Sequence, residues 1–139
     1  MMHSREKSPE NMQKNLEAYD DIFYEILSYF KNKAEYLETK GYDTGNIILD
    51  PGFGFAKSID DNYNLLAGIT SLKSLGMPVL AGVSRKSFIK YIVGSNKSEI
   101  LSGNLALASY LKLKGVDIIR VHDVKQTSSA LSLLERITA

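Results

Sequence analysis

The chain has 139 residues, of which 44% are hydrophobic and 24% are charged, and its formal net charge is +1 at pH 7. This size fits one domain, and the near-neutral charge gives no electrostatic reason to expect nucleic acid or an anionic membrane as a partner. Cysteine is absent, which excludes thiol catalysis and zinc–thiolate sites within this sequence. No membrane-spanning apolar run and no signal-peptide core are visible, so we predict one cytoplasmic unit over residues 1–139.

The first predicted elements are a short strand and a long helix. Met1–His3 is a candidate for the end of a strand. Ser8, Pro9 and Glu10 then form a typical helix start, with Ser as the N-cap and Pro at the first helical position. Apolar residues recur at helical spacing from Leu16 onward, which predicts a helix from Ser8 to about residue 41.

Further helices follow at regular intervals. Ser58 is predicted to cap a second helix whose apolar side chains are Leu65, Leu66, Ile69 and Leu72. A third helix is expected over about 98–114 and a last one over about 126–137. Their apolar positions are Leu101, Leu105, Leu111 and Leu113 in the third helix and Leu131, Leu134 and Ile137 in the last.

Three joints between these helices and short apolar runs look alike. Gly41, Gly76 and Gly115 each follow an amphipathic segment, where glycine accepts the left-handed conformation of a helix end. The runs 47–49, 79–81 and 118–121 come next and are typical of buried parallel strands. The spacing of about 35–40 residues matches a βα unit and predicts an α/β fold with a parallel sheet. The order suits half of a (β/α)₈ TIM barrel or a small doubly wound sheet.

Ionisable residues follow each predicted strand, and in parallel α/β folds this is where active sites lie. The first strand is followed by Asp50-Pro-Gly-Phe-Gly-Phe55, whose glycines permit close approach of a ligand and whose rings, Phe53 and Phe55, could face a flat substrate. The alternative is a tight turn with packing aromatic residues and a helix-capping acid.

The other two strand ends carry cations. Arg85 and Lys86 sit on a strand-to-helix turn, where they suit an anion or form a simple solvated pair. Ile118, Arg120 and His122 share one face of their strand, which we expect to be at least partly buried. An arginine beside a histidine suits phosphate or pyrophosphate, and the alternative is an internal ion pair with Asp50 or Asp123.

Three motifs in this order resemble the C-terminal half of the dihydropteroate synthase family. They are Asp-Pro-Gly-Phe-Gly-Phe-Ala-Lys (50–57), Gly-Val-Ser-Arg-Lys-Ser-Phe-Ile (82–89) and Ile-Arg-Val-His-Asp-Val (119–124). The Gly-Asn-Leu-Ala run at 103–106 and Met2, His3, Pro9, Met12 and Gln13 also match the family pattern. The resemblance implies a TIM barrel that joins p-aminobenzoate to 6-hydroxymethyl-7,8-dihydropterin pyrophosphate, giving 7,8-dihydropteroate and pyrophosphate.

The resemblance also implies roles for individual residues. Asp50 would bind the amino edge of the pterin, and Lys86 would contact its carbonyl and ring. Phe55, Arg85 and Ser87 would line the p-aminobenzoate site. Arg120 and His122 would hold the departing pyrophosphate, with Mg²⁺ carried by that substrate and with no metal ligand supplied by the chain.

The family comparison adds three expectations about the whole molecule. The family's other pterin-binding Asp and Asn lie upstream of Met1, so we expect a fragment that is inactive alone, and Ala56 stands where the family usually has Gly. Homodimer contacts are expected through the helices at 98–114 and 126–137, and sulfonamide drugs are expected inhibitors. The alternatives are a methyltetrahydrofolate methyltransferase-like barrel and a non-catalytic pterin-binding or assembly remnant.

Overall fold

Short parallel strands lie at the centre of the fold, and helices connect them. The computed structural model describes residues 1–6 and 19–138. The elements are α1 (Ile22–Thr39), the 3₁₀ helix η1 (Thr44–Asn46), α2 (Ile59–Ala67), the 3₁₀ helix η2 (Ile69–Leu75), β1 (Leu80–Ala81), α3 (Ser87–Val93), α4 (Lys97–Leu113), β2 (Ile118–Ile119) and α5 (Val124–Thr138).

The strands pair in parallel, as the alternating pattern predicts. In the register of β1 and β2, Leu80 lies beside Ile118 and Ala81 beside Ile119. Isolated parallel bridges join Leu49 to Val79 and Met2 to Asp50. The residues at 1–3, 48–50, 79–81 and 118–119 therefore lie side by side in chain order, and the expected strand at Met1–His3 is confirmed as a bridge.

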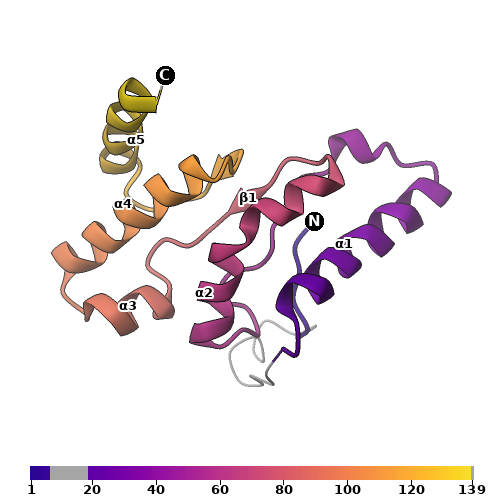
Figure 1. Cartoon of the computed structure of the whole chain (residues 1–139), viewed down its shortest axis with the longest axis horizontal. Helices are drawn as coiled ribbons and strands as arrows, with labels where there is room; N and C mark the ends of the chain where they lie inside the picture. The colour runs from indigo at the N-terminus through magenta and orange to yellow at the C-terminus, as the bar shows by residue number, and fades with distance from the viewer. Residues whose placement is uncertain (7–18, 139) are drawn as a thin grey trace.

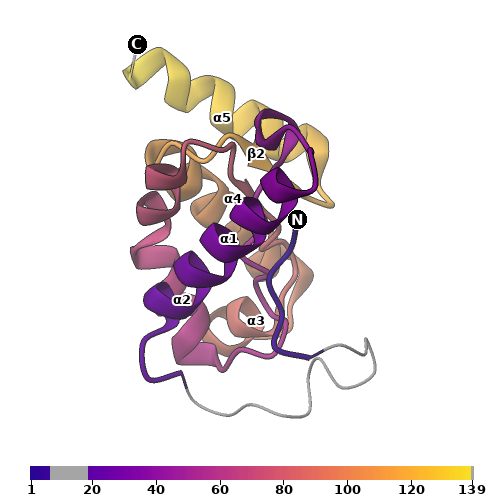
Figure 2. The ribbon, with the colours of Figure 1, turned by 90° about the vertical axis from the view of Figure 1, so that its right-hand side faces the viewer.

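The helices cover one face of this sheet. In Figure 1, α1 lies on one side of β1 and α3 and α4 on the other, α2 lies between α1 and α3, and α5 is at the far end from α1. Figure 2 shows α1 and α2 adjacent in the turned view, and α1 packs against both α2 and η2. Leu49 and Val79 point into the helical layer and are fully buried, together with Phe30 and Phe88. Burial of these side chains is the main driving force for docking the helices on the strands.

The helix ends follow the predicted chemistry. Gly41, Gly76 and Gly115 all have left-handed φ angles, of 80°, 72° and 72°. Ser58 caps α2 in a reciprocal capping box: its hydroxyl accepts from the Asp61 N–H while the Asp61 carboxylate accepts from the Ser58 N–H. Each device satisfies backbone groups that a helix end leaves unpaired.

Three helix boundaries differ from the sequence prediction. The predicted start at Ser8–Glu10 and the apolar Leu16 lie outside the described residues, but 19–21 are not helical and Asp21 is the N-cap of α1. The second predicted helix divides at Gly68 into α2 and η2. At Gly68 a Cβ atom would lie 2.3 Å from the Phe23 ring, so this glycine permits close packing of α1. Helix α3 forms where only a turn leading to a helix was predicted.

Some side chains expected in the core lie at the surface. Leu113 in α4 and Ile137 in α5 are 60% and 80% exposed. The face carrying Ile118 and Arg120 is exposed as well, so the prediction that it is partly buried is wrong for the residues described. The reason is that the helices pack on the opposite face of the strands. Among the described helices, none combines the length and apolarity needed to cross a membrane.

Candidate functional site

A cavity of about 310 Å³ opens where the strands end. Three separate segments form it: the turn after the strand at 48–50, the turn between β1 and α3, and the segment after β2. The residues that line it are Phe55, Gly82, Ser84, Arg85, Lys86, Arg120 and His122. The parallel arrangement brings these segments to one edge, as expected for the carboxyl ends of parallel strands.

Lys86 and Phe55 lie next to each other in the lining of this cavity. The Lys86 Nζ lies 4.1 Å from the centroid of the Phe55 ring, within the range of a cation–π contact. Burial lowers the pKa of Lys86, the nearby Arg120 cation lowers it further, and the Asp50 carboxylate opposes both effects. A Cβ on Gly54 would lie 3.0 Å from the Lys86 Cδ, so the glycine leaves room for this side chain.

Arg120 lies across the adjacent strand and has no carboxylate partner among the residues that the structure describes. Its backbone N–H donates to Ala81 at 2.9 Å, which fixes the strand end. The guanidinium occupies the space over Gly82, where a Cβ would come within 2.6 Å of Nη2. The alternative of an ion pair between Arg120 and Asp50 or Asp123 is therefore not observed, and this cation remains available to an oxyanion.

His122 is held by Ser84. The Ser84 hydroxyl accepts from the His122 backbone N–H at 3.3 Å and lies 3.0 Å from Nδ1 of the ring. Ser84 is only 5% exposed, so its hydroxyl position is fixed by packing. The arrangement leaves the other nitrogen of the imidazole available for a ligand.

Arg85 differs from Lys86 and Arg120 because its charge is already paired. Its guanidinium donates to the Asp123 carboxylate at 2.6 Å, which lowers the pKa of Asp123. Its backbone has a left-handed φ of 59°, and its N–H donates to the buried amide oxygen of Asn104 at 3.0 Å. Asp123 is thus the ion-pair partner of Arg85, and the backbone strain of this turn is balanced by Asn104.

Two predicted site residues do not line the cavity. Asp50 is half-buried at its strand end, and one of its carboxylate oxygens accepts from the Gly52 N–H at 2.8 Å. Ser87, the first residue of α3, is exposed. Phe53 is 1% exposed and packs against Phe88, so for this ring the alternative of a packing aromatic residue is the one observed.

Sequence reasoning missed the buried polar residues behind the site. Besides Ser84 and Asn104, these include Asn62, whose amide oxygen accepts from the Gly54 N–H at 2.8 Å. Asn62 is 2% exposed inside α2. An asparagine in a helix interior is unfavourable without a specific partner, and this is the signal that could have identified it.

The described part of the chain contains no group of three His, Asp or Glu side chains placed to hold a metal ion. Asp50 is the carboxylate that acts on the pKa of Lys86, and it already accepts a backbone hydrogen bond. Mg²⁺ prefers several oxygen ligands in octahedral geometry. These side chains do not form such a site by themselves.

Comparison with known protein families gives a consistent match. Residues 1–122 match the family described as "Pterin binding enzyme". The dihydropteroate synthase of Escherichia coli K12 is 41% identical over 135 residues, which is 97% of this chain and 47% of that protein. The chain thus spans about half the length of the curated relatives it matches.

Solved structures show the same fold over nearly the whole chain. Dihydropteroate synthase of Yersinia pestis, in a sulfonamide drug complex, is 36% identical with a TM-score of 0.90 over 99% of this chain and 49% of that one. The Xanthomonas albilineans enzyme in complex with 7,8-dihydropteroate is 33% identical with a TM-score of 0.87, covering 99% and 51%. The fold is therefore α/β, corresponding to half of a TIM barrel.

Proposed function

Because this chain belongs to the pterin-binding enzyme family, we propose that it forms part of a dihydropteroate synthase. The reaction would join p-aminobenzoate to 6-hydroxymethyl-7,8-dihydropterin pyrophosphate and release pyrophosphate. The observation that carries the proposal is the cavity that holds Lys86 and Arg120 together. Neither cation is paired with a carboxylate in the part of the chain that the structure describes, so both can bind an anionic substrate.

We propose that the substrates would bind in and beside the cavity in a definite order. Arg120 and His122 would hold the pyrophosphate, and Lys86 would contact the pterin carbonyl beside it. The Asp50 carboxylate keeps lone pairs beyond the one used by Gly52, and these could accept the amino and N3 hydrogens of the pterin. Phe55 would face the p-aminobenzoate ring, with the Arg85 and Ser87 turn beside it.

The chemical step needs no nucleophilic side chain. The C–O bond to pyrophosphate breaks with its electron pair going to the leaving group, the amine nitrogen bonds to the same carbon, and the amine loses a proton. Arg120 and His122 would stabilise the charge that grows on the leaving oxygen. We propose, from the family resemblance, that the pyrophosphate substrate would bring its own Mg²⁺, and we assign no step to the metal.

The test is release of pyrophosphate from the pterin pyrophosphate by the 139-residue chain, alone and mixed with the remaining half of the Escherichia coli relative. We expect release in the mixture that depends on p-aminobenzoate and is inhibited by a sulfonamide. Lys86→Ala should abolish it, whereas Lys33→Ala, an exposed lysine on α1, should not. Pterin binding without pyrophosphate release would support the non-catalytic alternative. If Lys86→Ala still bound the pterin and still released pyrophosphate, the proposed site would be refuted.

A methyl-transferring pterin barrel is disfavoured because methyl transfer has no anionic leaving group for Lys86 and Arg120 to hold.

A homodimer through α4 and α5 stays a prediction, supported by the exposed Leu113 and Leu133 on these helices. The cytoplasmic location also stays a prediction.

A further inference from the structure

Lys57 is a buried lysine directly behind the proposed site. Lys57 is only 4% exposed, which is unusual for a lysine unless its ammonium group is fully hydrogen-bonded. Its Nζ lies 3.1 Å from the Gly52 carbonyl oxygen, 3.1 Å from the Phe55 carbonyl oxygen and 3.2 Å from Nδ1 of His3. An ammonium group has three N–H donors, so these acceptors use all of them.

The two carbonyls belong to the turn that presents the substrate-facing groups. Gly52 donates its N–H to Asp50, and Phe55 donates its own N–H back to the Gly52 carbonyl at 3.1 Å. Phe55 also carries the ring that faces Lys86 in the cavity. Lys57 therefore binds, from the core side, the same turn whose other side holds the Asp50 carboxylate and the Phe55 ring.

The third acceptor anchors the turn to the first strand. His3 is 2% exposed, and its backbone N–H donates to the Asp50 backbone carbonyl at 2.9 Å. A Cβ on Gly52 would lie 2.0 Å from the His3 carbonyl oxygen, so turn and strand are in direct backbone contact. Because Lys57 donates to Nδ1, the proton of the neutral imidazole is placed on Nε2.

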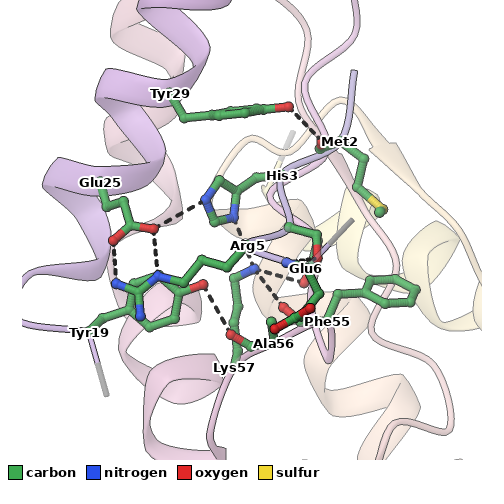
Figure 3. Close-up of polar contacts among 12 residues, drawn as sticks. Met2, His3, Arg5, Glu6, Tyr19, Glu25, Tyr29, Phe55, Ala56 and Lys57 are labelled. Atoms are coloured by element: carbon green, nitrogen blue, oxygen red, sulfur yellow. Dashed lines mark hydrogen bonds and ion pairs between the residues drawn. The ribbon is translucent and has the colours of Figure 1, made fainter. Parts of the chain in front are cut away.

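Figure 3 shows how the contacts continue beyond His3. Its Nε2 faces a Glu25 carboxylate oxygen at 3.6 Å, and Glu25 also forms an ion pair with Arg5. The Tyr29 ring packs edge-on against the imidazole, with 5.0 Å between the centroids. Helix α1 thus fixes His3, and His3 fixes the lysine.

We propose that Lys57 is a positioning residue for the pterin-binding side of the site. Its ammonium cross-links the turn at 50–55 to His3 and so fixes the Asp50 carboxylate and the Phe55 ring relative to the strand at 1–3. The proposal rests on the proposed function for the roles of Asp50 and Phe55. The cross-link itself is independent of that function and can be tested without a ligand.

The first arm of the test is nitrogen NMR on the unmodified chain and on Lys57→Met, which keeps an unbranched side chain one atom shorter and removes its donors. In the unmodified chain, His3 should show a protonated Nε2 and an unprotonated Nδ1. In Lys57→Met this preference should fall, and the amide signals of Gly52 and Gly54 should shift while that of the remote Gly115 does not. A protonated Nδ1 in the unmodified chain would overturn the proposal even if the variant does not fold.

The second arm measures ligand affinity in the same mixture with the complementing half, using 6-hydroxymethylpterin and inorganic pyrophosphate as probes. Lys57→Met should weaken the pterin probe about tenfold and leave pyrophosphate nearly unchanged, because Arg120 lies on another strand. Lys57→Arg should recover part of the loss, and Lys33→Met serves as the matched control. Equal weakening of both probes would show that Lys57 only stabilises the fold.

The two proposals fail in different ways. If the mixture with unmodified chain binds neither probe, the proposed function is wrong, while the NMR arm still decides whether Lys57 holds the turn. If the mixture binds pterin and Lys57→Met binds it equally well, the positioning role is wrong and the function stands.

Discussion

Gly82 determines where the Arg120 guanidinium can lie. The side chain of Arg120 crosses this position so closely that a Cβ would meet Nη2 at 2.6 Å and Cζ at 3.1 Å. The φ angle of Gly82 is not left-handed, so alanine can adopt the backbone conformation without strain. The glycine is therefore explained by the neighbouring cation and not by the turn.

We predict that Gly82→Ala displaces Arg120 and weakens pyrophosphate binding about tenfold, with a change of under about 1 kcal/mol in the free energy of unfolding. The stability change is small because the atom that must move is the end of a flexible side chain. Calorimetric titration with pyrophosphate in the complemented mixture, beside urea unfolding, measures both. Weak binding by Arg120→Ala with normal binding by Gly82→Ala would contradict this role for the glycine.

The buried His3 should make the fold sensitive to mild acid. Burial first, and then the Lys57 cation, lower the pKa of His3 from 6.5 to about 4. Between these two values the unfolded chain binds a proton that the folded chain does not, so stability is complete above pH 6.5 and falls as the pH approaches 4. The loss from this group is at most about 3 kcal/mol.

Urea unfolding at pH 7, 6 and 5 measures this loss. The His3→Gln variant should lose clearly less stability over the same range, because its side chain does not titrate. The Glu25 carboxylate has a pKa lowered by Arg5 and contributes only below pH 4.5, outside most of this window. Equal pH dependence of the two proteins would contradict the assignment to His3.

The site residues show what a sequence pattern can and cannot predict at this scale. Arg120, His122 and Lys86 are placed together because strand ends meet at one edge, which the α/β alternation already indicates. The partners of Lys57 are different, since two of its acceptors are backbone carbonyls and the third is far away in sequence at His3. No side-chain pattern records a carbonyl, so a buried lysine of this kind is visible only in three dimensions.

At the scale of elements, helix existence was predictable and helix boundaries were less so. The capping box at Ser58 and the glycines after α1, η2 and α4 are local signals, and the structure confirms them. The start of α1 at Ile22, after the N-cap Asp21, and the division at Gly68 depend on tertiary contacts instead. Tyr19 shows this, because its hydroxyl donates to the distant Ala56 carbonyl at 3.0 Å.

The packing of α1 on α2 should depend on the absence of a side chain at Gly68. We predict that Gly68→Ala destabilises the chain by about 1–3 kcal/mol, because its methyl group would overlap the Phe23 ring. In a double-mutant cycle, Phe23→Leu should reduce this cost, since it removes the ring atoms that the methyl group would meet. Urea unfolding of the unmodified chain, the two single variants and the double variant gives the interaction energy. Additive effects would show that position 68 and the Phe23 ring are not in contact.

At the scale of the whole molecule, the face of the strands opposite the helices is apolar and uncovered among the described residues. Met2, Ile48 and Ile118 are 36%, 38% and 37% exposed. The alternation along the strands places them on one face, together with the half-buried Leu80. Arg120 and Lys86 lie at the carboxyl end of this same face. A partner that covers Met2, Ile48, Leu80 and Ile118 would therefore also lie next to the site.

We therefore predict that the 139-residue chain self-associates in a concentration-dependent way, because exposed parallel edges and an apolar face both favour pairing. Ile48→Glu combined with Ile118→Glu should shift the population towards monomer in sedimentation velocity. Tyr24→Glu combined with Tyr36→Glu, which adds the same charge at exposed positions of α1, should not. Adding the complementing half of the Escherichia coli relative should replace self-association with a mixed complex, and the Glu pair should block this as well. If the Glu pair left both assemblies unchanged, the face would not be the surface that pairs, and the site would be closed by other residues.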